Sequence, residues 1–341
     1  MEILPATSMN AKDWNHFVEN NYPPVGAFMQ TFEWGTFQKD LGRKISRQVV
    51  MDGKKILAIF TLVEFKLRLG LSYGYIPRGP VIAKGSSVEK TSALFETIRK
   101  WSKEKFPHLI FLRLEPPTLF SETFRQPGFS FPSHYIQPRY NAVVDLTRSE
   151  EEILTSFHSS TRSNIKRAEK RGVTVTIKKT LTDEDYTAFT EMMHDTILRN
   201  SGKNAYPGDV YFRYFLKTVP YTAYFGYHEG ELASAHFVLF VGKTATYIYG
   251  ASHTSHLNSK VDTYLHWTAM KDARKKHCEY YDLGGIDPKR WPSLTTYKRQ
   301  YHGKEFEYLG NIDIPFRPFH YRIYSGARNI KVWLSKITSK K

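Results

Sequence analysis

An internal repeat constrains the fold of this sequence more than any other feature, because one order of expected elements occurs twice, about half a chain apart. The first copy, residues 47–117, reads as a hairpin that turns at Asp52-Gly53, followed by a strand, a helix and a further strand. The second copy, residues 221–288, repeats this order with a hairpin that turns at Glu229-Gly230. We therefore expect an α/β (α+β) protein of two related domains, each with a mixed, largely antiparallel sheet and a crossover helix. The two expected helices are residues 88–105 and 261–276.

The segments outside the two copies complete this plan. A strand over residues 141–146 precedes a long helix over residues 149–171, which begins at a capping box on Ser149. A single strand over residues 305–314 closes the sheet, and Pro315 opens a basic C-terminal helix. The expected domains are residues 1–146, with residues 315–341 packed back on them, and residues 147–314.

Composition narrows the class of protein. A chain of 341 residues with 41% hydrophobic and 24% charged residues fits a globular protein with two cores. The single cysteine, Cys278, excludes an internal disulfide framework and any multi-cysteine metal site, and we expect it to be a packing residue. The first twenty residues lack the basic start and apolar run of a signal peptide, and the longest strongly apolar run, residues 56–63, is far shorter than the ~18 to 20 residues of a membrane span. We therefore expect a cytoplasmic protein without a transmembrane segment.

The charge of the chain favours a polyanionic partner. Lys and Arg number 49 against 33 Asp and Glu, a formal net charge of +16. Residues 162–179 contain seven basic residues and one acid, Glu169, and residues 315–341 contain seven basic residues and no acid. Either run alone is typical of a solvated helix face, but the two together favour contact with a phosphate backbone.

Common catalytic motifs are missing from the sequence. It contains no G-x-x-x-x-G-K-[ST], no G-x-S-x-G and no H-E-x-x-H. His253 and His256 have no neighbouring acid or histidine in the sequence that would complete a metal site, so we interpret them as loop residues. The tandem plan is also typical of acyl-CoA N-acetyltransferases, but the expected helix starts read KGSSVEK and LNSKVDT and lack the glycine-rich turn that binds pyrophosphate.

Six motifs stand in a distinctive order along the chain: QPRYNAVVDL (137–146), STRSNIKRAEKRGVTV (160–175), TYIYGAS (246–252), YYDLGGID (280–287), TYKRQYHG (296–303) and KEFEYLGNID (304–313). In this order they resemble the Fem (FemA/FemB/FemX) family of tRNA-dependent peptidyltransferases. The resemblance runs from FEWGTF (32–37) to Asp313, and no long helical arm is evident, so the chain is most similar to the compact FemX type.

The resemblance implies two tandem acetyltransferase-like (GNAT-like) domains. It also implies transfer of an amino acid from aminoacyl-tRNA to the stem-peptide amino group of a peptidoglycan precursor, as in cell-wall cross-bridge synthesis. Because an aminoacyl ester is already activated, we expect no cofactor and no metal. The implied partners are aminoacyl-tRNA and a UDP-linked or lipid-linked muropeptide, with peripheral contact to the inner face of the plasma membrane left open.

The resemblance also assigns roles to individual residues. Lys298, beside Tyr297, is the implied catalytic cation that stabilises the negative oxygen formed during attack on the ester. Tyr211 and Tyr249 are implied substrate-site residues. Glu115 matches a family acid, although it could equally pair with a nearby arginine, Arg113 or Arg139.

Two further sets of residues complete the expected site. Thr36 and Tyr206 stand where family members that use a nucleotide-linked precursor carry phosphate-binding cations, and Lys39, Arg43 or Lys203 could substitute. This departure leaves the acceptor open between a nucleotide-linked and a lipid-linked precursor. The residues expected to contact tRNA are Arg299, Arg317, Arg322, Arg328 and Lys331.

Two other classes of function stay open at this point. A tRNA-independent or CoA-dependent N-acyltransferase would reuse the fold, since fold does not fix function, but it would need a pyrophosphate-binding turn. A non-catalytic basic protein that binds RNA or a membrane surface would need the basic helices and would have no use for Lys298 and the two tyrosines.

Overall fold

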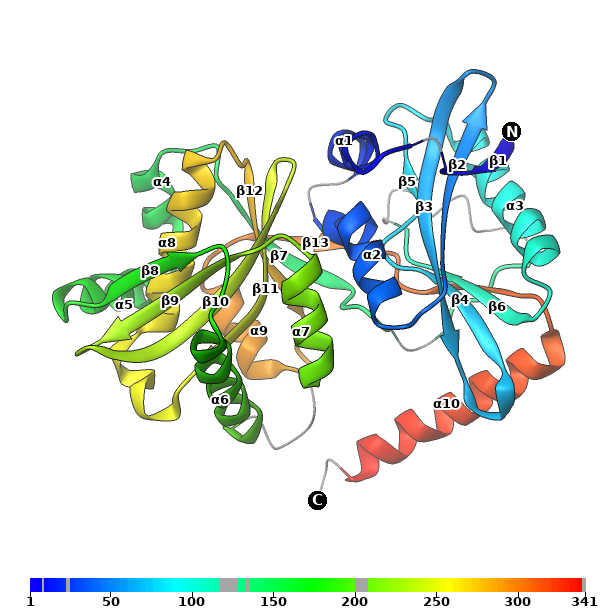
Figure 1. The fold of residues 1–341 in the computed structure, drawn as a ribbon. Coiled ribbons are helices and arrows are strands. Elements are labelled where there is room, and N and C mark those ends of the chain that lie inside the picture. The colour runs from blue at the N-terminus through cyan, green and yellow to red at the C-terminus, as the bar shows by residue number, and fades with distance from the viewer. Residues whose placement is uncertain (8, 23–24, 117–127, 133–134, 200–207, 339–341) are drawn as a thin grey trace. The chain divides into compact units, whose positions relative to one another are not determined.

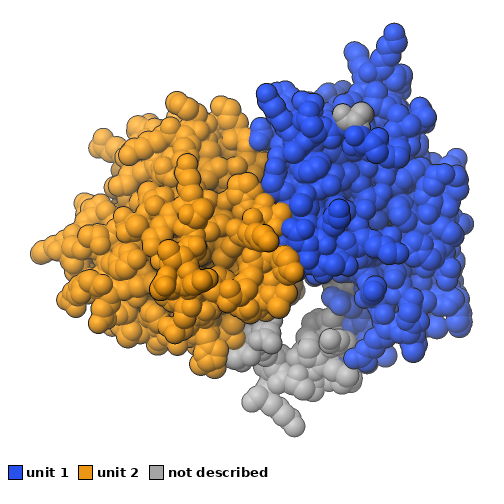
Figure 2. All heavy atoms as spheres, in the orientation of Figure 1, with its two compact units in different colours: residues 1–139, 307–341 blue, residues 140–306 orange. Residues whose placement is uncertain are grey.

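The chain divides into two compact units, which Figure 2 distinguishes by colour: unit 1 is Met1–Arg139 with Glu307–Lys341, and unit 2 is Tyr140–Phe306. The expected boundaries, after residues 146 and 314, therefore lie a few residues beyond the observed ones. The computed structural model describes residues 1–7, 9–22, 25–116, 128–132, 135–199 and 208–338, with side chains up to residue 330.

Unit 1 is built on a mixed sheet with the strand order β1-β2-β3-β4-β6-β14, to which β5 adds by pairing with β3 (Figure 1). Neighbouring strands are antiparallel except β4 and β6, which are parallel and are joined through helix α3. The strands are β1 (Glu2–Pro5), β2 (Ile45–Asp52), β3 (Lys55–Lys66), β4 (Ser72–Ile76), β5 (Val81–Ile82), β6 (Leu109–Leu114) and β14 (Ile312–Pro315). The helices are α1 (Ala11–Asn21), α2 (Phe32–Asp40), α3 (Val88–Lys105), α10 (Pro318–Thr338) and the 3-10 helices η1 (Ala27–Gln30) and η2 (Arg68–Gly70).

Unit 2 repeats this plan with the strand order β13-β7-β12-β11-β10-β9-β8. Strands β11 and β12 are parallel and are joined through helix α8, as β4 and β6 are joined through α3. The strands are β7 (Tyr140–Asp145), β8 (Thr174–Lys178), β9 (Thr222–His228), β10 (Glu231–Val241), β11 (Thr244–Ser252), β12 (Tyr280–Ile286) and β13 (Lys304–Glu307). The helices are α4 (Glu150–Ser156), α5 (Ser159–Lys170), α6 (Asp183–Arg199), α7 (Asp209–Thr218), η4 (Thr254–Ser259), α8 (Val261–Lys275) and α9 (Pro292–Arg299).

The predicted repeat and fold class are confirmed by these two sheets. The first hairpin turns at Gly53-Lys54, one residue beyond the predicted Asp52-Gly53, because Asp52 still pairs with Lys55. Gly53 takes the positive φ of 61° that a tight turn needs. The second turns at Glu229-Gly230, where both residues have positive φ, as a two-residue type I′ turn requires. The crossover helix α3 spans residues 88–105 as predicted. It begins at Ser87, whose side chain accepts from the Lys90 amide, and it buries Leu94, Phe95 and Ile98 against the sheet.

The predicted single helix over residues 149–171 is wrong, because the chain breaks it into α4 and α5. Phe157 adopts an extended backbone, and its fully buried ring contacts the rings of Trp267 and Tyr301 edge-on. His158 then caps α5 by accepting from the Ser160 amide. The capping box on Ser149 is present as predicted. Burial of the Phe157 ring therefore accounts for the break between α4 and α5. The helical pattern of charges in the sequence does not indicate this break.

The predicted single strand over residues 305–314 is also wrong. It forms two strands in different sheets: β13 joins the sheet of unit 2, whereas β14 pairs with β6 in unit 1. Gly310, with φ of 89°, lies between them, and a side chain there would collide with the Tyr135 ring. In the opposite sense, β7 follows unit 1 in sequence but pairs with β12 of unit 2. Each sheet is thus completed by a strand that the sequence places next to the other repeat.

The C-terminal helix α10 begins at Pro318, three residues later than predicted, because Pro315 still belongs to β14. It packs on the sheet of unit 1: the Tyr321 ring lies edge-on to Phe111 on β6, and the Arg317 amide donates to the Ile110 carbonyl. In the part of the chain that the structure describes, no helix is long and apolar enough to cross a membrane.

A buried ion pair fastens β14 to β6. Arg113 and Asp313 are both fully buried, and the guanidinium donates from Nε and Nη2 to the two carboxylate oxygens at 2.6 and 2.7 Å. The Tyr321 hydroxyl of α10 donates to the same carboxylate at 3.0 Å. One carboxylate therefore holds together the strand that closes the sheet and the helix that covers it.

We expect Asp313→Ala to lower the free energy of unfolding by about 3 to 5 kcal/mol, because the Arg113 guanidinium would remain buried without a counter-charge. Urea denaturation followed by circular dichroism measures this loss. The control is Glu307→Ala, which removes the partly exposed pair with Arg139 and should cost no more than about 1 kcal/mol. Equal stability of the wild type and Asp313→Ala would contradict the importance of the buried pair.

Candidate functional site

In unit 2 the two parallel strands β11 and β12 part after their first three residues. Their pairing covers Thr244 to Thr246 against Tyr280 to Asp282, although both strands continue further. The corresponding strands of unit 1, β4 and β6, stay paired up to Ile76 and Leu114, where both end. An opening between parallel strands is therefore a feature of unit 2, and the residues that line it are candidates for the site.

Lys298 on α9 lies at this opening. Its Nζ donates to the Gly285 carbonyl of β12 at 2.9 Å and lies 5.8 Å from the centroid of the Tyr247 ring of β11. The residue is only 5% exposed. Gly284 has φ of 80°, and a side chain there would come within 3.4 Å of Nζ and 3.1 Å of the Tyr247 carbonyl. The glycine pair of YYDLGGID thus leaves room for the lysine and offers it a carbonyl.

Burial and nearby carboxylates set the protonation of Lys298. Burial lowers the pKa of its ammonium to about 8, although the negative charges of Asp282 and Asp262 oppose this shift. Asp282 is fully buried and accepts from the Asn141 side chain and from the Gly284 amide at 2.7 Å. These contacts fix the carboxylate, so the ammonium has a stationary counter-charge.

A cluster of histidines and tyrosines surrounds Asp262. This carboxylate bonds to His236 Nε2 at 2.7 Å and to the Tyr297 hydroxyl, which also lies 2.9 Å from the Tyr301 hydroxyl. Burial alone would raise the pKa of Asp262, but His236 and these hydrogen bonds hold it below its ordinary range. Burial and the charge of Asp262 raise the pKa of Tyr297 well above its usual value. We call His236, Asp262, His266, Tyr247, Tyr281, Tyr297 and Tyr301 the Asp262 cluster.

His266 completes the Asp262 cluster. Its ring centroid lies 4.3 Å from that of His236 and 4.6 Å from that of Tyr247, and its Nδ1 lies 3.1 Å from the Tyr281 hydroxyl. Burial, His236 and the Lys298 charge lower the pKa of His266 well below its usual value, so it is neutral at pH 7.

Three members of the cluster have the chemistry of metal ligands. Among the described residues, His236, Asp262 and His266 each offer a ligand atom within 4.8 Å of the others. A metal ion would have to break the bond between His236 and Asp262, and it would lie close to the Lys298 ammonium, whose charge already acts on His266. The cluster is therefore better suited to hold protons and to stabilise the Lys298 ammonium than to bind a metal ion.

The two tyrosines expected to bind substrate lie together on the other face of the sheet. Tyr211 on α7 hydrogen-bonds with Tyr249 on β11, and burial together with Tyr211 raises the pKa of Tyr249 well above its usual value. Tyr249 also contacts Phe212 edge-on, whereas Tyr247 contacts the histidines. A bulge between these positions, opposite Phe237 and Val238, turns Tyr247 and Tyr249 to opposite faces. Tyr247 and Tyr249 both lie in the part of β11 that is no longer paired with β12.

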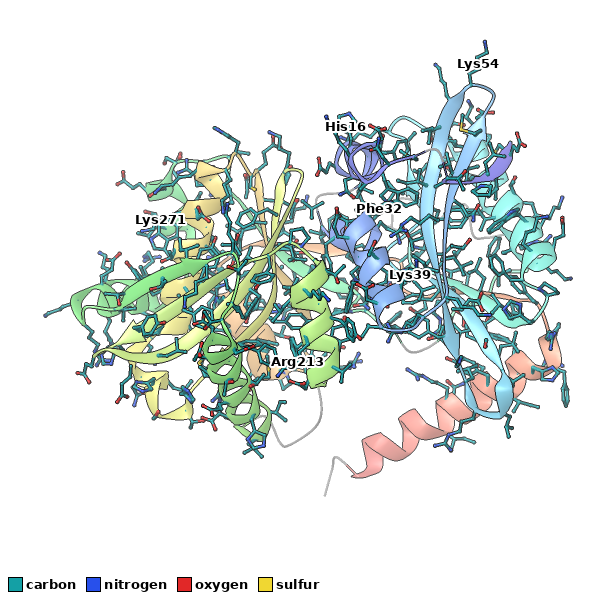
Figure 3. All side chains as sticks on the ribbon, viewed as in Figure 1. His16, Phe32, Lys39, Lys54, Arg213 and Lys271 are labelled. Atoms are coloured by element: carbon teal, nitrogen blue, oxygen red, sulfur yellow. The ribbon has the colours of Figure 1, made fainter. Side chains whose placement is uncertain are left out.

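The expected substrate residues of unit 1 have contacts inside that unit. Thr36 accepts from Arg47, whose guanidinium lies 3.7 Å from the centroid of the Phe32 ring that Figure 3 labels on α2. The Arg47 guanidinium thus lies next to Thr36. Glu115 is 1% exposed and accepts from the Tyr75 hydroxyl at 2.6 Å, not from either expected arginine. Tyr206 and Lys203 lie outside the described residues.

The cations expected to contact tRNA differ in their surroundings. Arg299 is paired with Glu305 at 2.7 Å, and Arg317 donates to the Pro107 carbonyl. Arg322 is exposed, and Arg328 is half-buried. Lys331 belongs to α10, in the part whose side chains are not described.

The basic residues of the run 162–179 in unit 2 form two groups: those whose side chains have partners within the protein, and those whose side chains are exposed. Arg162 donates to the Phe157 carbonyl, Arg171 to the Asn258 carbonyl, and Lys178 pairs with Asp185 at 2.5 Å. The other four basic residues of this run are exposed, and their side chains form no ion pair or hydrogen bond with the described residues. They are Lys166, Arg167, Lys170 and Lys179.

Sequence reasoning identified Lys298 and Tyr297 but missed His236, Asp262, His266 and Tyr247. The spacing of Asp262 and His266, four residues apart on one helix, puts them on one face and was an available signal. The sequence around His236 contains no such signal, because a histidine within a strand follows the same pattern as an ordinary core residue. His253 and His256, interpreted from the sequence as loop residues, lie near different acids: His253 near Asp195 and His256 near Glu231.

A lipid II:glycine glycyltransferase of Staphylococcus aureus (strain MRSA252) is 28% identical over 173 residues, 47% of this chain and 40% of that protein. The chain thus spans about two-fifths of the length of this relative.

Two solved structures share the fold. The crystal structure of FemX has a TM-score of 0.80 at 19% identity and covers 95% of this chain and 100% of its own. A tandem GNAT protein from the clavulanic acid biosynthesis pathway has a TM-score of 0.53 at 12% identity and covers 92% and 98%. The two units are therefore tandem GNAT-like domains.

The sequence profile of the FemAB family matches residues 9–130, 123–227 and 226–329, which together make up most of the chain. Its matches span both repeats and include Lys298 and the Asp262 cluster. The chain therefore belongs to the FemAB family.

Proposed function

We propose that the protein is an acyltransferase that moves an amino acid from aminoacyl-tRNA to the stem-peptide amino group of a peptidoglycan precursor. The family membership and the named activity of the staphylococcal relative support this class of reaction. The single observation that carries the proposal is the buried ammonium of Lys298 at the opening between β11 and β12. A buried cation with counter-charges on one side is suited to stabilise an anion that forms on the other side.

The proposed step is aminolysis of an ester. The acceptor amine forms a bond to the ester carbonyl carbon, and the carbonyl oxygen becomes negative in the tetrahedral intermediate. The bond to the tRNA ribose oxygen then breaks, the amide forms, and the proton lost by the amine passes to the departing ribose oxygen, which becomes a hydroxyl. Lys298 donates to the negative oxygen, a contact worth about 3 kcal/mol when it forms mainly in the transition state.

Other residues support acceptor binding. The Tyr211 and Tyr249 hydroxyls are hydrogen-bonded to each other at the opposite face of β11, where a polar group of the acceptor could exchange with that bond. The name of the staphylococcal relative specifies lipid II, so we propose a lipid-linked precursor as the acceptor. The acceptor amine attacks the ester carbonyl without ATP or CoA, because the aminoacyl ester is already activated.

The tRNA would be bound chiefly by the exposed basic residues of the run 162–179 in unit 2. Lys166, Arg167 and Lys170 on α5, with Lys179 after β8, are exposed, and their side chains have no hydrogen bond or ion pair with the described residues that tRNA would have to displace. Release of counterions from the tRNA backbone then drives binding.

The direct test incubates the protein with total charged tRNA and the lipid-linked precursor and weighs the product by mass spectrometry. A mass increase of one or more aminoacyl residues is expected. Acetyl-CoA and uncharged tRNA serve as controls, since transfer of an acetyl group would indicate the CoA-dependent alternative.

Lys298→Met should lower kcat by ~100-fold to 1000-fold, because it removes the donor to the developing negative oxygen while keeping a similar length. Tyr249→Phe should instead raise KM for the acceptor and leave kcat nearly unchanged, since a contact equal in ground and transition states changes only binding. Single-turnover transfer at saturating acceptor measures both. Wild-type kcat in Lys298→Met would refute its role.

The transfer rate should fall as the pH rises through about 8. Lys298 is a cation below its pKa of about 8 and loses its charge above it, so a step that needs the ammonium slows there. Asp262→Asn removes a charge that raises this pKa, so the fall should begin at lower pH. Rates are corrected for ester hydrolysis, measured without acceptor. A rate that instead rises through pH 8, and loses this rise in Lys298→Met, would show that Lys298 acts as a base.

Replacing Lys166, Arg167, Lys170 and Lys179 by Gln should weaken tRNA binding and flatten the dependence of log Kd on log salt by roughly one unit per lost phosphate contact. Filter binding over a series of salt concentrations measures the slope. The control replaces the exposed Lys54, Lys55 and Lys84 of unit 1, of which Figure 3 labels Lys54 on the first hairpin. An equal effect of the control set would show that net charge, not this surface, governs binding.

A further inference from the structure

Helix α10 exposes an apolar stripe on the face that it does not pack against the sheet. Phe319, Ile323 and Ile330 are 72%, 56% and 60% exposed. Their spacing of four and seven residues places them within about 40° of one another around the helix. Tyr321 and Tyr324, which pack on Tyr73 and Phe111, lie on the other side. The stripe therefore has no role in covering the sheet.

The connection between β3 and β4 adds a second apolar group beside α10. Leu67 and Leu71, on either side of its tip, belong to the same packed cluster as Tyr324 of α10, and Figure 1 shows the hairpin end next to the helix. At the tip itself, Leu69 is 96% exposed. It also takes a φ of 60°, a left-handed backbone conformation that is costly for a leucine.

Cations accompany these apolar side chains. Lys66 and Arg68 flank the tip of the hairpin, and Arg322 lies beside Ile323 on α10, all three exposed. The sequence from residue 314 to the end contains no acid. We define the α10 surface as Phe319, Ile323, Ile330 and Leu69 together with Lys66, Arg68 and Arg322.

We propose that the α10 surface docks unit 1 on an anionic phospholipid bilayer. A helix with one apolar face and basic flanks lies in the membrane interface with its apolar side chains among the acyl chains and its cations at the head groups. This inference rests on the proposed lipid-linked acceptor, because a protein that acts on such an acceptor gains from being held at the membrane. Docking then raises the local concentration of the precursor.

The apolar stripe argues against the two other occupants of this surface. Binding of tRNA, expected from the sequence for Arg317, Arg322, Arg328 and Lys331, uses the cations but gains little from exposed Phe and Ile side chains. A second copy of the chain would bring the same positive charges face to face across a two-fold axis. A bilayer with anionic lipids satisfies both the apolar and the positively charged parts of the surface.

The test is flotation of the full chain with phosphatidylcholine vesicles, with and without phosphatidylglycerol. The wild type should bind the anionic vesicles, and the triple variant Phe319→Ser, Ile323→Ser and Ile330→Ser should bind them ~10-fold to 100-fold more weakly. The control variant Val88→Ser with Ile177→Ser removes exposed apolar side chains of 54% and 48% elsewhere and should bind as the wild type does. Replacing Lys66, Arg68 and Arg322 by Gln should reduce binding and make it less sensitive to salt.

Vesicle binding needs no substrate, so the outcome is independent of whether the proposed transfer reaction is found. Transfer is measured separately with the precursor in detergent micelles, where the triple variant should retain wild-type kcat. Absence of wild-type binding to anionic vesicles, or unchanged binding of the triple variant, would overturn the proposal. A triple variant that loses tRNA affinity, or that changes from dimer to monomer, with vesicle binding unaltered, would overturn it in favour of RNA or a second copy.

Discussion

The ion pair between Arg113 and Asp313 is the interaction on which unit 1 depends. Its partners are 200 positions apart in sequence and fully buried, so neither charge is tolerated without the other. The pair forms only when the chain returns from unit 2 and lays β14 against β6. Because Tyr321 also donates to Asp313, the same carboxylate fixes the start of α10. The surface proposed to meet the membrane is thus positioned by a charge buried beneath it.

The candidate site depends on a different departure from regular structure. Unit 1 keeps β4 and β6 paired to their ends, whereas unit 2 parts β11 from β12 and fills the opening with Lys298. Burial of an ammonium is costly, and here Asp282 and Asp262 offset the cost while each is held by its own hydrogen bonds. The two repeats share an architecture, but only one of them carries a buried cation between parted strands in the described part of the chain.

The sequence predicted those features that depend on local patterns. Turn residues placed both hairpins, and apolar spacing with Ser87 as cap placed α3. It failed where a distant contact decides: burial of Phe157 breaks the expected helix, and pairing of β14 with β6 splits the expected strand. Lys298 came from the family resemblance and not from spacing. His236 could not be predicted, because its partner Asp262 lies on another element and only the fold brings them together.

The two units differ in what the helices on their sheets do besides covering them. In unit 2 both faces of the sheet are covered by helices that contribute to the site, with α8 bearing Asp262 and α7 bearing Tyr211. In unit 1, α3 covers one face and α10 lies on the other. A helix that served only to cover Tyr73 and Phe111 would need a single apolar face, and solvent would favour polar residues elsewhere on it. Helix α10 carries a second apolar face at Phe319, Ile323 and Ile330, which the packing of unit 1 does not require. Such a face is stabilised only when something apolar covers it, and the positive charges around it select an anionic bilayer over another basic surface.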